Sequence, residues 1–303
     1  MRPRQLAGLL LAATLGLTAC GGPSGEDSAA ASPTCPDGRI RMGVEPFEDP
    51  QKLIPAAEVL GDALERRLGC PVEVQVTDDY SAEVLAMRND ELELGIFGPL
   101  GFVFAEQRAG AEAVASFGTA DGALSTYTAG LWVPADSDVR EVAQLRDRTL
   151  ALGAVGSTSG DALPRQALLD AGLREGDVRV DYAGGHPEAL LALTNGKVDA
   201  AEINTQQLAS AVESGIFDPS RFRQIWTSAP IPNDPVTVRG NTSPEFKAAV
   251  TDALLNLDAQ AVGEIGALLD VDPPGKLVPV THETYAPLFE LAQKLGLTEE
   301  DVE

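Results

Sequence analysis

The chain has 303 residues, of which 44% are hydrophobic and 22% charged, so it is long enough for one large domain or two modest lobes. Acidic residues outnumber basic ones by 46 to 22, which gives a formal net charge of −24. This balance makes nucleic acids and anionic membrane surfaces poor partners, and it requires that any bound anion be held by local donors.

The first residues have the pattern of a signal peptide. Arg2 and Arg4 are followed by an apolar run over 6–17, which is too short to span a bilayer. The run ends in small residues before Cys20 and resembles the lipobox of bacterial lipoproteins. That resemblance implies removal of residues 1–19 and a lipid on the sulfur of Cys20. An ordinary secretory signal with an incidental cysteine is the alternative.

A polar segment follows, and we expect residues 20–35 to form a lipidated, flexible tether, because they contain too little apolar surface to fold. The remaining cysteines, Cys35 and Cys70, each precede a strand-like run. If these runs are neighbouring parallel strands, both cysteines lie at one sheet edge within bridging distance. The sequence favours a disulfide between them over two free thiols.

Strand-like and helix-like segments then alternate, which indicates an α/β fold. In the first half we expect strands over 39–45, 72–77 and 92–97, helices over 50–68 and 81–89, and a further helix after Gly98-Pro99. The pattern restarts with strands over 129–134, 149–154, 178–183 and 198–203 and helices over 159–172 and 187–195. Helices over 244–268 and 282–295 complete the chain.

The restart suggests two lobes. Residues 84–98 align without gaps on 190–204, with Tyr80 opposite His186 and Gly98 opposite Asn204. A chance match of two ordinary helix–turn–strand units is the alternative. We expect one lobe from 36–127 plus 233–303 and another from 128–232, joined by a hinge, with a ligand cleft where the carboxyl ends of the strands meet.

The clearest candidate site is the run Ser157, Thr158 and Ser159, which is flanked by glycines and lies between a buried strand and a helix. Helix N-termini expose unpaired N–H groups, and hydroxyls add donors without adding charge, which suits a tetrahedral anion. An ordinary N-cap cluster is the alternative.

Three other side chains are candidate donors. His186 stands at a loop-to-helix turn after two glycines, and Tyr80 and Tyr127 occupy comparable strand-edge positions. A solvent-exposed histidine and simple tyrosine packing are the alternatives.

No sequence pattern indicates catalysis. Only His186 and His282 are histidines, and the sequence contains no HExxH or CxxC spacing. Thr158 occupies the centre of the glycine-flanked cluster, so the cluster is not a GxSxG nucleophile elbow, and it contains no lysine, so it is not a P-loop. We therefore expect no catalytic residues, no metal and no cofactor.

Several segments resemble the periplasmic and lipoprotein receptors of phosphonate, phosphite and phosphate ABC importers, which have the type II periplasmic-binding-protein fold. The segments that carry this resemblance are GVEPFEDPQKL (43–53), DYSAEVLAMRN (79–89), FGPLGFVFA (97–105), GSTSGDALP (156–164), YAGGHPEALLALTNGKVDAAEINT (182–205) and WTSAPIPNDPVTVR (226–239).

The resemblance also implies a set of ligand-binding residues. The side chains that match positions holding the anion or lining the pocket are Tyr80, Tyr127, Ser157, Thr158, Ser159, His186 and Asn204. Two departures alter the expected pocket: Ala129 stands where a serine is common, and Phe97 stands where some members have tyrosine.

The resemblance implies an extracytoplasmic solute-binding protein of an ABC importer, monomeric and attached to the membrane through its lipid alone. Its partners would be a small phosphorus oxyanion and the permease and ATPase of the importer. A sensory lipoprotein that reports an anion to a membrane kinase, and an enzyme on a similar two-lobed fold, are the alternatives.

The nature of the ligand's substituent is a further hypothesis. Glu202 and Asn204 are two apart on an expected strand and should share a face toward the cleft, and Glu45 ends the first strand of the other lobe. Carboxylates there would suit a ligand with a cationic amine. The alternative, which we prefer for Glu202, is pairing with a Lys or Arg or exposure to solvent. Glu45, Phe97 and Glu202 together form the expected substituent pocket.

Overall fold

The computed structural model describes residues 32–297. The expected signal peptide, Cys20 and most of the expected tether lie outside this range. Among the described residues, no helix is both long enough and apolar enough to cross a bilayer.

The first lobe is built on a six-stranded sheet in the order β13-β4-β12-β3-β1-β2. Strands β1, β2 and β3 run parallel, whereas β12 is antiparallel to β3 and β4, and β13 is antiparallel to β4. Its strands are β1 (Ile40–Val44), β2 (Val72–Val76), β3 (Leu94–Ile96), β4 (Glu112–Thr119), β12 (Pro235–Val238) and β13 (Pro274–Pro279). Its helices are α1 (Pro50–Leu68), α2 (Tyr80–Arg88), α3 (Pro99–Ala109), α7 (Pro244–Leu255), α8 (Ala259–Leu268) and α9 (Ala286–Leu295).

The second lobe is built on a five-stranded sheet in the order β10-β6-β9-β7-β8. Strands β7, β8 and β9 run parallel, and β6 is antiparallel to β9 and β10. Its strands are β6 (Gly130–Pro134), β7 (Thr149–Leu152), β8 (Arg179–Tyr182), β9 (Ala200–Glu202) and β10 (Phe222–Thr227). Its helices are α4 (Leu163–Asp170), α5 (His186–Thr194) and α6 (Thr205–Glu213). Short 3₁₀ turns lie at Pro36–Gly38, Val142–Leu145, Pro219–Arg221 and His282–Tyr285, and a π-helix lies at Thr158–Ala162.

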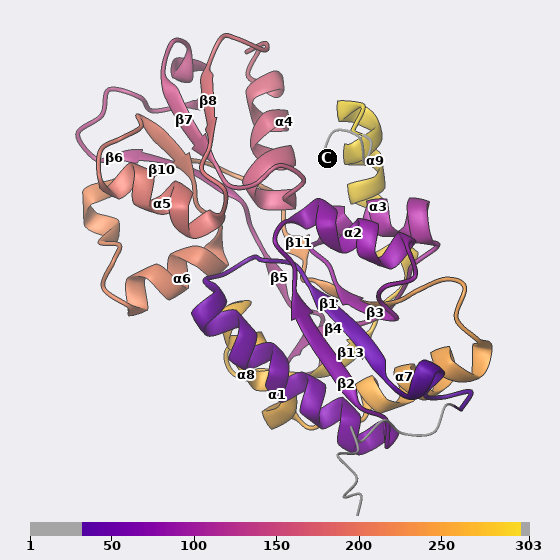
Figure 1. Cartoon of the computed structure of the whole chain (residues 1–303). Coiled ribbons are helices and arrows are strands. Elements are labelled where there is room, and N and C mark those ends of the chain that lie inside the picture. Colours follow the sequence, from indigo (N-terminus) through magenta and orange to yellow (C-terminus); the bar gives the residue numbers. More distant parts are fainter. Residues whose placement is uncertain (1–31, 298–303) are drawn as a thin grey trace, which may run out of the picture.

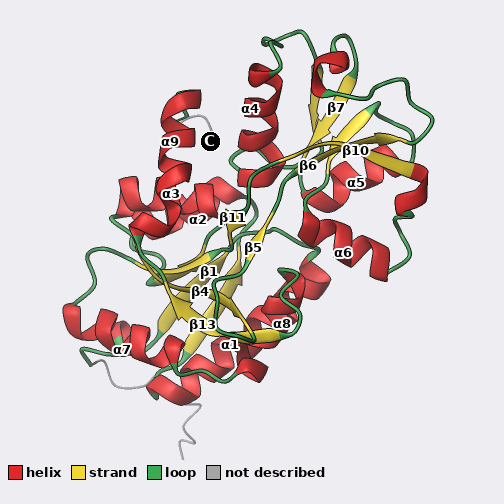
Figure 2. Cartoon of the chain, turned by 180° about the vertical axis from the view of Figure 1, so that it is seen from behind, coloured by secondary structure: helices red, strands yellow, loops and turns green. Residues whose placement is uncertain are grey.

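Both lobes are layered α/β structures with helices on each face of the sheet (Figures 1 and 2). In the first lobe, α1, α7 and α8 pack with the strands into one apolar cluster, and α2, α3 and α9 contribute to a second. In the second lobe, α4 and the pair α5 and α6 contribute to separate clusters. The expected two-lobed α/β fold is confirmed.

Two crossings connect the lobes. Strand β5 (Thr126–Tyr127) on the outgoing chain pairs antiparallel with β11 (Ile231–Pro232) on the returning chain. Prolines in the returning segment restrict its backbone, which suits a short two-stranded hinge. We propose that the lobe boundaries lie at this ribbon, with residues 36–127 and 233–303 in one lobe and 128–232 in the other.

The helix–turn–strand repeat predicted from the sequence occurs in the structure. Helix α2 and strand β3 occupy the same positions of the alignment as α5 and β9. The first residues of the two helices, Tyr80 and His186, are equivalent, and so are the first residues of the two strands, Leu94 and Ala200. Gly98 and Asn204 are the N-caps of the helices that follow. Equivalent sequence units therefore place residues at equivalent edges of the two sheets.

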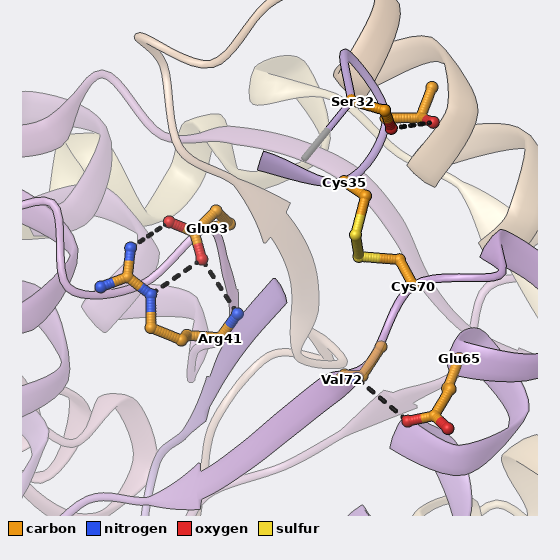
Figure 3. The surroundings of a disulfide bond; sticks show 8 residues. Ser32, Cys35, Arg41, Glu65, Cys70, Val72 and Glu93 are labelled. Carbon is orange, nitrogen blue, oxygen red and sulfur yellow. Dashed lines mark hydrogen bonds and ion pairs between the residues drawn. A yellow bond between two sulfur atoms is a disulfide. The ribbon is translucent and has the colours of Figure 1, made fainter. Parts of the chain in front are cut away.

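Cys35 and Cys70 form a disulfide, the pairing that the sequence favours, with their Cα atoms 5.6 Å apart (Figure 3). They precede the parallel neighbours β1 and β2, in which Ile40 pairs with Val72. Nearby, Arg41 donates its backbone N–H and its guanidinium to Glu93. The disulfide therefore lies at the amino ends of these strands, and the cleft lies at their carboxyl ends.

Three expected helices differ from the prediction. The segment 282–295 differs only in its first turn, which is the 3₁₀ turn His282–Tyr285. The segment 159–172 begins as a π-helix because Pro164 has no N–H to offer the Gly160 carbonyl, which accepts from Gly153 instead. The segment 244–268 is two helices, since Asp258 caps a new helix by accepting from the N–H of Ala261. Strands β4, β10 and β13 were not predicted.

Candidate functional site

An enclosed pocket lies where both lobes meet the hinge, at the carboxyl ends of the parallel strands. Its lining combines uncharged donors with acidic side chains, and no lysine or arginine is among the described residues that line it. The lining residues are Glu45, Phe47, Tyr80, Gly98, Tyr127, Ser157, Thr158, Ser159, His186, Asn204, Gln206 and Asp234.

The serine-threonine-serine run forms one wall of this pocket. Its three side chains are buried, and each hydroxyl oxygen already accepts a hydrogen bond. Ser157 Oγ accepts from the Gly160 N–H at 3.1 Å and acts as an N-cap, and Thr158 Oγ1 accepts from the Leu100 N–H at 2.8 Å. Ser159 Oγ accepts from Asn204 Nδ2 at 3.1 Å. The Thr158 and Ser159 hydroxyls can still donate their protons, either to the Tyr127 phenol beside them or to an acceptor in the pocket.

Asp161 holds the loop that carries this run, a role that sequence reasoning missed. Its Oδ2 accepts from the Gly156 N–H at 3.1 Å, and its Oδ1 accepts from the Tyr182 hydroxyl at 2.7 Å. Gly156 has a φ of 88°, a conformation that glycine adopts at little cost. The backbone and Asp161 together fix the direction of the three hydroxyls before any ligand is bound.

His186 begins α5 and connects the hydroxyl wall to a buried acid. Its Nε2 lies 3.2 Å from Ser157 Oγ, and its Nδ1 lies 2.7 Å from Glu202 Oε1. Burial is the largest single influence on the pKa of His186 and lowers it, but attraction and hydrogen bonding from Glu202, with smaller contributions from Asp234 and Glu48, outweigh it. The net result is a pKa above the ordinary value of 6.5.

The opposite side of the pocket is acidic. Glu45 accepts from the Gly98 N–H through Oε2 at 2.6 Å, while its Oε1 has no hydrogen-bond partner among the described residues. Burial, and then the neighbouring Glu83 carboxyl, raise the pKa of Glu45 well above its ordinary value. Burial likewise raises the pKa of Asp234 to about 7, and the charge of His186 opposes that shift.

Two tyrosines complete the donor set. Tyr80 begins α2 and Tyr127 lies in the hinge strand β5, and both are buried. Burial is the main reason that the pKa of each phenol lies well above its ordinary value. Both hydroxyls therefore remain protonated and able to donate to an anion throughout the physiological pH range.

The structure brings together most of the residues singled out from the sequence. Tyr80, Tyr127, the hydroxyl run, His186, Asn204 and Glu45 all line the pocket. Four lining residues were missed, namely Phe47, Gly98, Gln206 and Asp234. Asp234 lies in a segment that carries the family resemblance, 226–239, but it was not assigned a role.

Two members of the expected substituent pocket are placed differently, and the sequence interpretation of them is corrected. Phe97 does not line the cavity, because it packs in the apolar cluster formed with α2 and α3. Glu202 is fully buried behind His186, with which it pairs. Among the described residues its ion-pair partner is His186 and not a lysine or arginine, and its side chain is not exposed to solvent, so the preferred alternative for Glu202 is wrong. Glu202 is also not among the lining residues, as the amine hypothesis required.

The arrangement is suited to holding an anion without a metal. Among residues 32–297, no cluster of three or more His, Cys, Asp or Glu side chains has the geometry of a metal site. Hydroxyl and imidazole donors converge on one side of the cavity, where they would stabilise negative charge through short, charge-assisted hydrogen bonds.

Comparison with known proteins assigns the chain to a family. The model of the ABC transporter phosphonate periplasmic substrate-binding proteins matches residues 42–299. The chain belongs to this family. Members of the phosphonate-binding family are substrate-binding components of ABC transporters and act outside the cytoplasm, so the resemblance and the function read from the sequence are confirmed at this level.

Two relatives are about a quarter identical to this chain over the aligned segments. It is 28% identical over 222 residues to the phosphonates-binding periplasmic protein of Escherichia coli, a match that covers 72% of this chain and 65% of that protein. It is 25% identical over 233 residues to the phosphate-import protein PhnD of Mycolicibacterium smegmatis, covering 73% of this chain and 71% of that protein.

A solved structure shows the same fold. PhnD1 of Prochlorococcus marinus, solved in complex with methylphosphonate, superposes with a TM-score of 0.75 at 18% identity, covering 88% of this chain and 99% of that one. At this identity the similarity concerns the fold alone.

Proposed function

We propose that this chain binds a small phosphorus oxyanion, a phosphonate, phosphite or phosphate, between its lobes and delivers it to the permease of an ABC importer. One observation carries the proposal: the hydroxyls of Thr158 and Ser159 and the His186 imidazole converge on the same enclosed cavity as the phenols of the other lobe and the hinge. Family membership and the names of the two relatives support the ligand class.

The substituent on phosphorus would lie toward the acidic side of the pocket. Glu45 and Asp234 come from the first lobe, and both are buried in the lining. If they are ionised in the complex, they would favour a ligand with an amine. If they remain protonated, they would act as neutral hydrogen-bonding groups and admit a plain alkyl substituent or a hydroxyl.

A second candidate function is hydrolysis, and one observation favours it. Ser157, His186 and Glu202 are connected in the order of a Ser-His-acid triad. We nevertheless propose binding without chemistry, because Ser157 Oγ is occupied as the acceptor of the Gly160 N–H and serves as an N-cap. Labelling with a serine-reactive fluorophosphonate tests this directly: an adduct on Ser157 would support the hydrolase.

We further propose that the protein is a monomeric lipoprotein that is anchored through Cys20 and held near an ABC permease and its ATPase. The lipobox-like residues before Cys20 and the polar segment 20–35 support this attachment. Mass spectrometry of the membrane-extracted protein should find diacylglycerol on an N-terminal Cys20. A water-soluble mature protein without lipid would refute it.

The ligand class is tested by calorimetry with phosphate, phosphite, methylphosphonate and aminoethylphosphonate. Saturable one-to-one binding of at least one of these compounds is expected, with sulfate as the control anion. A competition between aminoethylphosphonate and ethylphosphonate then tests the acidic side of the pocket, since the two ligands differ only by the amine. Equal affinities for the two phosphonates would show that Glu45 and Asp234 do not recognise the amine.

A further inference from the structure

Glu202 is a buried acid at a strand position where packing alone would favour an apolar residue. It ends β9, inside the sheet of the second lobe, and its side chain is fully buried. In the internal repeat its counterpart is Ile96, an aliphatic residue that ends β3 of the first lobe. A buried carboxyl costs folding free energy unless it is paired, so this exchange implies a role beyond packing.

Two glycines make room for the pair that Glu202 forms with His186. A Cβ atom on Gly153 would lie 2.8 Å from Glu202 Oε1, and a Cβ atom on Gly160 would lie 2.8 Å from His186 Cε1. A side chain at either position would be too close to the acid or the imidazole unless one of them moved. The loop on either side of the hydroxyl run is therefore shaped around this pair as well as around the anion.

We propose that Glu202 is a positioning residue that keeps His186 in its doubly protonated form and aims its Nε2–H at the oxyanion beside Ser157. The inference rests on the proposed function for its ligand, but the state of His186 is a property of the protein alone. Glu202 takes the Nδ1 proton at 2.7 Å, which fixes the ring and leaves Nε2 to face Ser157 at 3.2 Å.

The charges around His186 explain why its pairing with Glu202 would matter for anion binding. No lysine or arginine is among the described residues that line the pocket, so the imidazole is the one group there able to carry a positive charge. Carboxyls face it from several elements: Glu202 from β9, Glu48 from the segment after β1, and Asp234 from the residue before β12. All three favour its charged form, and Glu202 alone does so through a hydrogen bond.

A doubly protonated His186 can donate to a bound anion but cannot act as a general base. A general base must accept a proton from the nucleophile, and an imidazolium cannot do so. The connected series of Ser157, His186 and Glu202 would then hold an oxyanion and leave Ser157 inactive as a nucleophile.

Nuclear magnetic resonance of the imidazole nitrogens tests the first half of the proposal in the ligand-free mature protein. The chain has two histidines, His186 and His282, and His282 also faces a carboxylate, that of Glu106, at 2.9 Å but in an exposed pair. We expect the pKa of His186 to lie above its ordinary value of 6.5 and to be lower in Glu202→Gln. Titration of His186 in the unmodified protein at or below its ordinary value would overturn the proposal, whether or not the variant folds.

Calorimetry with methylphosphonate tests the second half. At pH 8, Glu202→Gln should bind methylphosphonate about tenfold more weakly than the unmodified protein does, because a charge-assisted hydrogen bond becomes a neutral one. The difference in affinity between the two proteins should become smaller as the pH falls. Comparing the two proteins at each pH cancels the titration of the ligand. Glu202→Asp should restore part of the affinity at pH 8, and Glu106→Gln, the matched change in the exposed pair, should have no effect.

The outcomes separate this inference from the proposed function. An affinity ratio between Glu202→Gln and the unmodified protein that stays constant from pH 5.5 to 8 would overturn the role of Glu202. If the unmodified protein binds none of the phosphorus oxyanions, the proposed function fails, while the nitrogen titration still decides the state of His186.

Discussion

The backbone N–H of Leu100 donates a 2.8 Å hydrogen bond to the hydroxyl of Thr158, across the boundary between the lobes. Leu100 lies in the first turn of α3, where N–H groups have no partner within the helix, and Thr158 opens the π-helix of the second lobe. The hydroxyl that faces the cavity therefore also ties the lobes together. The Thr158 side chain therefore contributes both to holding the lobes closed and to binding the ligand.

Thr158→Val keeps the side-chain shape but removes both interactions. We expect methylphosphonate affinity to fall by about tenfold to a hundredfold, since a charge-assisted hydrogen bond contributes roughly 1.5–3 kcal/mol. Thr158→Ser should retain most of the affinity, and Thr251→Ala, which removes a hydroxyl bound to the Lys247 carbonyl on α7, is the control. Unchanged calorimetric affinity in Thr158→Val would remove this residue from the site.

Two further contacts join the lobes near the surface. Lys294 of α9 pairs with Asp170 of α4 at 3.1 Å, where the two helices lie side by side (Figure 1), and Lys52 donates to Ser210 at 2.8 Å. Because exposed pairs contribute little, replacing both lysines by alanine should weaken ligand binding by less than about fivefold.

Small-angle scattering should show a more open ligand-free form of the double-lysine variant, and added salt should produce a smaller change in the same direction. Lys197→Ala, an exposed lysine of the second lobe, serves as the control. Scattering curves that superimpose for the double variant and the unmodified protein would show that these contacts do not hold the lobes together.

Asp234 should make the ligand-free protein less stable as the pH rises. Its pKa is about 7 in the folded protein against an ordinary 3.8, so the folded state binds an extra proton between these values and loses stability as the pH increases through them. Asp234→Asn should therefore unfold with a free energy higher by about 2–4 kcal/mol at pH 8 and close to unchanged at pH 4.

Denaturant titrations at the two pH values measure this difference, with the exposed Asp62→Asn as the control. Parallel stability curves for Asp234→Asn and the unmodified protein would mean that Asp234 is not held protonated by burial.

The disulfide should stabilise the fold without affecting the site. Cys35 and Cys70 are 35 residues apart, and closing a loop of this length stabilises the folded state by about 3–4 kcal/mol in the chain-entropy account. Reduction, or Cys35→Ser with Cys70→Ser, should lower the unfolding free energy by this amount and leave methylphosphonate affinity unchanged. A melting temperature insensitive to reductant would contradict the prediction.

Much of the fold follows from sequence pattern. The α/β alternation, the repeat of α2–β3 in α5–β9 and the disulfide at a shared sheet edge are local or periodic features, and the sequence predicts them. Strands β4 and β13 were missed because they owe their place to antiparallel pairing between distant segments, Glu112–Thr119 with Pro274–Pro279, which no local pattern reveals.

The site divides in the same way. The hydroxyl run stands next to a helix start, so its chemistry can be read from neighbouring residues. The pairing of Glu202 with His186 depends on how β9 and α5 pack within the second lobe, and the approach of Asp234 depends on how the two lobes meet. Spacing along the chain does not encode these distances. Phe97 was misplaced because its assignment rested on a match to a position where some family members have tyrosine, whereas its apolar ring is buried in the cluster formed with α2 and α3.

The central claim is that the pocket between the lobes binds a phosphorus oxyanion through the hydroxyl run, and calorimetric titration of methylphosphonate into the mature protein and into Thr158→Ala with Ser159→Ala tests it most directly. We expect saturable one-to-one binding to the unmodified protein and a loss of at least about a hundredfold in the double variant, as two charge-assisted hydrogen bonds are removed. Equal affinity of both proteins for methylphosphonate, or tight binding of sulfate in its place, would contradict the account.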